Sequence, residues 1–159
     1  MWREFVKARY NVDAQFLDLS VRTRRPLACS CAASNHCLQR LSDDVVLKKY
    51  NLAPPGIPGK TSKTGAVVFK LASQLKPPPI TVSLAHNGLT STSDFQTLSH
   101  YLPGVRNLSL EDNALKEMRD IEPFAGRRGR LTTLRELILA GNPLRETEFA
   151  AGKGDKFQK

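Results

Sequence analysis

Three stretches of the chain carry the same spacing of aliphatic residues around a single Asn. The stretches are PITVSLAHNGL, VRNLSLEDNAL and LRELILAGNPL, and they place Asn87, Asn113 and Asn142 at their ninth position. Each stretch also has Leu or Val at positions four and six, and Leu at position eleven. The asparagines are 26 and 29 residues apart, which is long enough for one short strand and one helical segment per repeat.

This period and this pattern are typical of leucine-rich repeats. In such a repeat a short strand turns positions four and six inward, and the chain then turns sharply. A buried Asn in that turn has both a donor and an acceptor, so it can pair main-chain groups of its own turn and of the neighbouring repeat. The sequence therefore predicts an α/β leucine-rich-repeat solenoid of about four repeats, with short parallel concave strands and convex helices. Asn87, Asn113 and Asn142 are predicted to form a structural ladder inside it.

The repeats organise the rest of the chain into one predicted domain. Upstream, AQFLDLSVR has leucines at positions four and six but Arg22 at the position of the Asn, as expected of an atypical terminal repeat. The tail AAGKGDKFQK has little that could cap a solenoid, so we expect a fragment of a longer protein. The predicted parts are an N-terminal helical cap (1–13), a degenerate first repeat (14–23), a helix-containing insertion and linker (24–79), three repeats (80–146) and a tail (147–159).

Several helices are predicted from sequence signals and the spacing of apolar residues. One starts at Ser42-Asp43-Asp44, and two convex helices are marked by Phe95, Leu98 and Leu102 and by Met118, Ile121 and Phe124. Two more precede and follow the first repeat. One lies in the cap, where the helical spacing is that of Trp2, Phe5, Val6 and Tyr10. The other runs from Thr64 to Leu75 and is expected to bury one face, made of Val67, Val68, Leu71 and Leu75.

The net charge of +9 and the pI of about 9.8 favour polyanionic partners such as nucleic acid, or an acidic protein or lipid surface. The repeat register predicts that this positive charge is absent from the concave face. Side chains at positions three, five and seven of each strand should line the concave face, and they are neutral to acidic. They are Phe16, Asp18 and Ser20; Thr81, Ser83 and Ala85; Asn107, Ser109 and Glu111; and Glu136, Ile138 and Ala140.

The basic residues are therefore expected on loops and flanks, where they can contact phosphates without reading bases. Arg106 and Arg135 share position two of neighbouring repeats and should lie side by side near the strand starts. Few aromatic residues accompany the basic clusters, so base stacking is not indicated. A solvated basic surface with no ligand is the alternative. The clusters are Arg22, Arg24 and Arg25; Lys48 and Lys49; Lys60 and Lys63; and Arg127, Arg128 and Arg130.

No catalytic constellation, cofactor site or metal site is predicted. GIPGKTSKTG has the wrong glycine spacing for a phosphate-binding loop. Cys29, Cys31, His36 and Cys37 do not have the spacing of a standard zinc motif, so free thiols in a reducing compartment are expected. No apolar run approaches transmembrane length, and MWREFVKARY is too charged for a secretory signal.

Three segments carry a resemblance to a known family: FVKARYNVDAQFLDLS, ITVSLAHNGLTSTSDFQTLSHYLPGVRNLSLEDNAL and TTLRELILAGNPLRE. They resemble the leucine-rich-repeat domain of the nuclear RNA export factor family, the Tap/Mex-type mRNA export receptors, in its fungal form. The stretch from Arg24 to Arg40, the Pro/Gly linker and the tail after Glu146 match no motif of that family.

The resemblance implies an RNA- and adaptor-binding module of an mRNA export receptor that shuttles between nucleus and cytoplasm through nuclear pores. It implies binding of mRNA with low sequence specificity and contact with REF/ALY-type adaptors. A small NTF2-like partner and nucleoporins would bind through modules outside this chain. Lys7, Arg9 and Arg22 are the basic positions that match the family. Seven residues of the charge clusters complete a set of ten predicted to bind RNA: Arg24, Arg25, Lys48, Lys49, Arg127, Arg128 and Arg130. The alternative function is a leucine-rich-repeat scaffold that binds proteins through its concave face.

Overall fold

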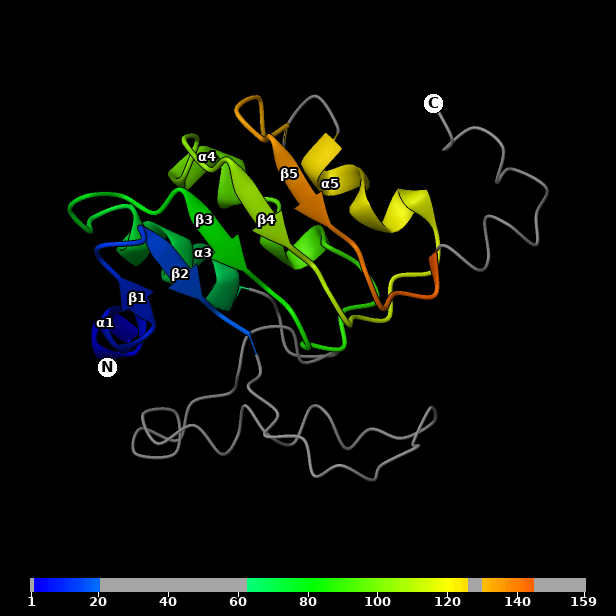
Figure 1. Cartoon of the computed structure of the whole chain (residues 1–159), viewed down its shortest axis with the longest axis horizontal. Coiled ribbons are helices and arrows are strands. Elements are labelled where there is room, and N and C mark those ends of the chain that lie inside the picture. The colour runs from blue at the N-terminus through cyan, green and yellow to red at the C-terminus, as the bar shows by residue number, and fades with distance from the viewer. Residues whose placement is uncertain (1, 21–62, 126–129, 145–159) are drawn as a thin grey trace, which may run out of the picture.

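A computed structural model describes residues 2–20, 63–125 and 130–144 of the chain (Figure 1). The strands are β1 (Tyr10–Asn11), β2 (Phe16–Asp18), β3 (Thr81–Ser83), β4 (Asn107–Ser109) and β5 (Glu136–Ile138). The helical elements are α1 (Trp2–Ala8), α3 (Lys63–Ala72), the 3₁₀ turn η1 (Ser93–Phe95), α4 (Leu98–Tyr101), the 3₁₀ turn η2 (Met118–Ile121) and α5 (Glu122–Ala125).

The five strands form one sheet in the order in which they occur in the chain. β1 runs antiparallel to β2, whereas β2, β3, β4 and β5 are parallel. Equivalent residues of successive repeats lie opposite one another, so Leu17, Val82, Leu108 and Leu137 form one row across the sheet. Figure 1 looks onto one face of the sheet, with α3 behind β2 and β3.

The core lies between the sheet and the helices. Positions four and six of the strands point into it, and Leu17 and Val82 have no exposed surface. α3 covers the first repeats, where the ring of Phe69 lies 5.9 Å from that of Phe95 in η1. Burial decreases at the last strand, because Leu108 is 1% exposed and its neighbour in the row, Leu137, is 38% exposed.

The three asparagines are buried, and each connects its own turn to the preceding repeat. The Nδ2 groups of Asn87, Asn113 and Asn142 donate to the carbonyls of Leu19, Leu84 and Leu110, which share position six of the preceding repeats, at 3.1, 3.0 and 2.8 Å. The Oδ1 atom of Asn113 also accepts from the amides of Asn87 and Leu89, both at 3.0 Å. These bonds supply the main-chain partners that a buried turn requires.

The predicted helix of the cap is shorter than expected, because α1 ends at Ala8 and Tyr10 belongs to β1. The Tyr10 hydroxyl donates to the carbonyl of Pro77 at 2.5 Å, and burial raises the pKa of that phenol. The cap therefore consists of a helix and an edge strand, and the hydroxyl fastens the strand to the segment that leads into β3.

The predicted inner face of α3 is wrong at one position. Val67 is 40% exposed, whereas Phe69, which was not predicted to face the core, is fully buried. The helix ends at Ala72, and Leu75 follows it in a turn. Apolar residues occur on both sides of this helix, so the packing against η1 rather than the spacing alone decides which face is buried.

Candidate nucleic-acid interface

Three of the ten basic residues predicted to bind RNA lie in the described part of the chain: Lys7, Arg9 and Arg130. The other seven, Arg22, Arg24, Arg25, Lys48, Lys49, Arg127 and Arg128, lie outside it. Lys7 is exposed in the last turn of α1. Arg130 is exposed immediately before Leu131, whose amide donates to the carbonyl of Phe124. The structure does not bring Lys7 and Arg130 together, because they belong to opposite ends of the sheet.

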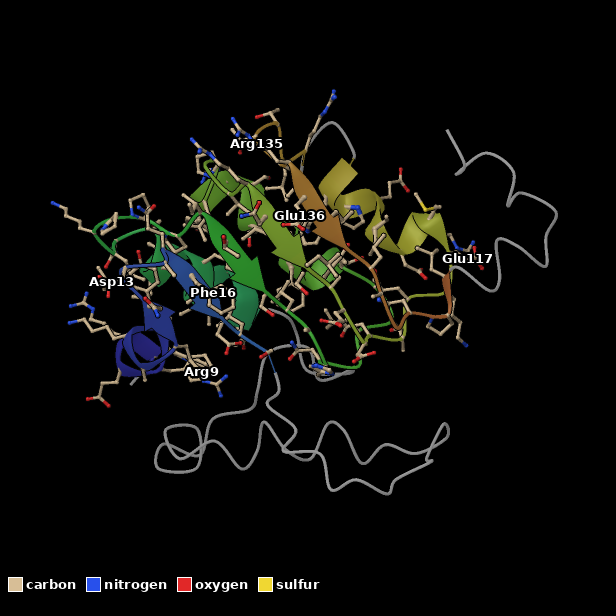
Figure 2. All side chains as sticks on the ribbon, in the orientation of Figure 1. Arg9, Asp13, Phe16, Glu117, Arg135 and Glu136 are labelled. Carbon is tan, nitrogen blue, oxygen red and sulfur yellow. The ribbon has the colours of Figure 1, made fainter. Side chains whose placement is uncertain are left out.

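Arg9 is half-buried and has a structural role (Figure 2). Its Nη1 atom donates to the carbonyls of Ser20 at 2.9 Å and Asp18 at 3.4 Å. Its guanidinium carbon lies 5.3 Å from the centre of the Phe5 ring, within the range of a cation–π contact. Arg9 therefore joins α1 to the end of β2, and only part of its guanidinium faces solvent.

The concave face of the sheet carries no Lys or Arg at positions three and five of β2 to β5. Figure 2 shows Phe16 on β2 and Glu136 on β5, at either side of this face. Between them the side-chain Nδ2 atom of Asn107 donates to the hydroxyl of Thr81 at 3.0 Å. Asp18 is buried, and its Oδ1 atom accepts from the amide and the hydroxyl of Ser20. This face is neutral to acidic and offers nothing to neutralise a phosphate.

The turns after the strands are acidic and tightly bent. His86, Asp112 and Gly141 each precede a ladder Asn, and all three have positive φ angles, of 57°, 50° and 71°. The Nδ1 atom of His86 lies 3.2 Å from Oδ2 of Asp112, so the two side chains form an ion pair when the His is protonated. Together with Glu111, these side chains make the strand-end side a poor surface for a polyanion.

Neither metal ligands nor a membrane-spanning helix is found in the part of the chain that the structure describes. Within residues 2–20, 63–125 and 130–144 no three His, Cys, Asp or Glu side chains are grouped to hold an ion. No helix in these ranges is both long and apolar enough to cross a bilayer. The four residues Cys29, Cys31, His36 and Cys37 lie outside the described ranges.

The stacked parallel strands, the convex helical elements and the Asn ladder define the class: this is a leucine-rich-repeat solenoid. Two solved structures have the same fold. The Mex67 leucine-rich-repeat domain of Chaetomium thermophilum superposes with a TM-score of 0.61 at 22% identity, over 95% of this chain and 81% of that one. The Chaetomium Mex67:Mtr2 subunits give a TM-score of 0.59 at 22% identity, over 94% of this chain and 79% of that one. These likenesses confirm the predicted fold.

The sequence of the chain is similar to those of Mex67 mRNA export factors. It is 31% identical to the mRNA export factor mex67 of Schizosaccharomyces pombe and 27% identical to MEX67 of Candida albicans, in each case over 93% of its length. This confirms the resemblance to a Tap/Mex-type leucine-rich-repeat domain. The chain spans about a fifth of the length of these relatives (21% and 20%). No family model matches it.

Proposed function

We propose that the chain is the RNA- and adaptor-binding module of an mRNA nuclear export receptor. The observation that carries this proposal is the similarity to the Schizosaccharomyces pombe export factor, which extends over 93% of the chain. The net charge of +9 agrees with a polyanionic ligand. The neutral to acidic concave face then directs the RNA to loops and edges, where contacts to phosphates are independent of base sequence.

The proposed receptor shuttles between nucleus and cytoplasm. Its RNA would be mRNA, and REF/ALY-type adaptors would bind the same module. The Chaetomium Mex67 neighbour was solved together with Mtr2, which supports a small NTF2-like partner for the longer protein. That partner and the nucleoporins would bind through other modules of the longer protein.

The test is RNA binding by the 159-residue chain over a salt series. We expect unrelated single-stranded RNAs to bind with similar affinity, and the logarithm of the association constant to fall linearly with the logarithm of the salt concentration. Reversing Arg22, Arg24 and Arg25 to Glu should weaken the binding of all RNAs alike. Strong preference for one sequence, or affinity that does not respond to salt, would contradict the proposal.

A second candidate function is a protein scaffold that uses the concave face. The observation that favours it is the exposed Ile138, an apolar side chain on a concave face that carries no Lys or Arg at positions three and five of β2 to β5. A partner held there should survive high salt and should be lost on Ile138→Asp. If the captured protein instead elutes with salt and ignores that substitution, the concave face is not its binding site.

A further inference from the structure

Two arginines lie next to each other on the side of the sheet where the parallel strands begin. Arg106 and Arg135 occupy the same position in successive repeats, and Ile80 is the equivalent residue in the repeat before them. The carbonyl of Ile80 accepts from the amides of Arg106 and Asn107, and the carbonyl of Arg106 accepts from those of Arg135 and Glu136. Arg106 and Arg135 are therefore one strand spacing apart, which is about 4.8 Å in a sheet.

The loops that carry these two arginines are fastened to each other. The hydroxyl of Thr133 donates to the carbonyls of Pro103 at 2.6 Å and Val105 at 2.7 Å. The lead-in to β5 is thus bonded to the lead-in to β4, immediately before Arg135 and Arg106. Because these bonds connect the two lead-in segments, they fix the backbone positions from which the Arg106 and Arg135 side chains extend.

Neither guanidinium is neutralised by the residues that the structure describes. Arg9 is bonded to carbonyls and Arg119 is paired with Glu117 at 2.8 Å, but Arg106, Arg130 and Arg135 are exposed and have no such partner in the described ranges. Lys76, also exposed, opens the segment that leads to Ile80. We call Lys76, Arg106, Arg130 and Arg135 the strand-start edge.

No ion pair between this edge and an acidic residue is found in the described ranges. Asp13 lies at the other end of the sheet, by β1 and β2, and Glu136 lies on the sheet face below Arg135 (Figure 2). The Arg106 and Arg135 side chains extend from backbone positions about 4.8 Å apart, so their like charges repel each other. An anion between them relieves that repulsion, and a guanidinium fork matches the oxygens of a phosphate.

We propose that the strand-start edge is a phosphate-contacting track for single-stranded RNA. The RNA strand runs across the starts of β3, β4 and β5, with Arg106 and Arg135 on neighbouring phosphates and Lys76 and Arg130 extending the contact at either side. This inference rests on the proposed function for the identity of the ligand. It assigns the contact to Arg106 and Arg135, two residues outside the ten basic positions predicted above.

The experiment compares Arg106→Gln/Arg135→Gln with a control that removes two positive charges elsewhere, Arg3→Gln/Lys70→Gln on α1 and α3. All four side chains are exposed, so both double variants should fold, and thermal unfolding checks this. The probe is fluorescently labelled oligouridylate, titrated with the full 159-residue chain over a salt series. A poly-glutamate peptide is titrated in parallel.

We expect the edge variant to bind RNA at least about tenfold more weakly, because each charged contact is worth more than a neutral hydrogen bond. Its salt slope should shrink by about 0.7 for each phosphate of a single strand that the variant no longer neutralises. The control should keep both the affinity and the slope within about twofold of the unchanged chain.

Each other outcome has a defined meaning. If the unchanged chain binds RNA and the two double variants behave alike, the edge assignment is wrong and the proposed function stands. If the unchanged chain binds no RNA even at low salt, both fail. If poly-glutamate binds as tightly as RNA and is lost in the same edge variant, the edge takes an acidic peptide and the assignment to RNA is overturned.

Discussion

At the scale of the residue, the ladder asparagines have a role that no other side chain of their size can fill. Asn113 uses both ends of its amide: the oxygen accepts two main-chain amides of the preceding repeat, and the nitrogen donates to the carbonyls of Leu84 and Leu110. An Asp would lose the donor, and a Leu would lose both. The role of these residues could be read from the sequence because the Asn recurs at one position of every full repeat.

Asn113→Ala should lower the free energy of unfolding by about 3–5 kcal/mol, because it leaves several buried main-chain groups without partners. Asn107→Ala is the matched control, since that side chain is only partly buried and makes one hydrogen bond, to Thr81. It should cost about 1 kcal/mol or less. Urea unfolding measures both, and equal losses would show that Asn113 is not a special position.

Gly141 occupies a turn that a side chain cannot enter. Its φ is +71°, and an added Cβ would lie 1.8 Å from Oδ1 of Asp112. Gly141→Ala should therefore cost about 1–3 kcal/mol, from the left-handed backbone and from displacing the Asp112 carboxylate. Gly104→Ala, with nothing within 4 Å of the new methyl group, should change stability by no more than about 0.5 kcal/mol. Thermal unfolding of the two variants gives the comparison.

Arg9 shows where reasoning from single residues in the sequence ends. The resemblance identifies it as a basic position of the family, and its charge is visible in the sequence. Its bonds to the carbonyls of Ser20 and Asp18 are not visible, since they depend on how α1 and β1 turn back on β2. An arginine that faces solvent and one that holds two elements together have the same letter in the sequence.

At the scale of the element, α3 is the clearest case in which packing decides what spacing leaves open. Phe69 contacts η1 through Phe95 and is fully buried, whereas Val67 is 40% exposed. Phe69→Ala should lower the unfolding free energy by about 3–5 kcal/mol, because it removes a large side chain from a closed core. Val67→Ala should cost less than about 1 kcal/mol.

Chemical denaturation of both variants tests this assignment of the helix face. A larger loss from Val67→Ala would mean that α3 is rotated relative to the described packing. The sequence predicted that a helix lies here, and the burial of Val68 and Ala72 agrees with a helix packed on the sheet. The exact face follows from the packing of α3 on the 3₁₀ turn η1, and the spacing of apolar residues does not show that contact.

At the scale of the whole molecule, one repeat differs from the others in what covers it. Leu108 and Leu137 hold equivalent positions on neighbouring strands, but only Leu137 is substantially exposed. Leu108→Ala should cost about 2–5 kcal/mol, while Leu137→Ala should cost less than half as much, because its surface is already partly in water. Unfolding of the 159-residue chain by urea gives both values. Equal costs would contradict the described difference in burial.

The repeat register predicted the parallel strands, their inner rows and the composition of the concave face, since each follows from one aligned position repeated three times. What it could not predict depends on the ends of the stack and on loops of unequal length. The antiparallel β1 and the bond between Thr133 and the preceding loop occur once, and they leave no periodic trace in the sequence.

Because β1 is antiparallel to β2, further parallel repeats could be added at only one edge of the sheet. A further coil with the same strand direction could pair in register only beyond β5, because the opposite border of β2 is already occupied by β1. Additional repeats inserted after β5 should therefore lengthen the array. The same repeats inserted before β2 could pair with it only after displacing β1 and α1.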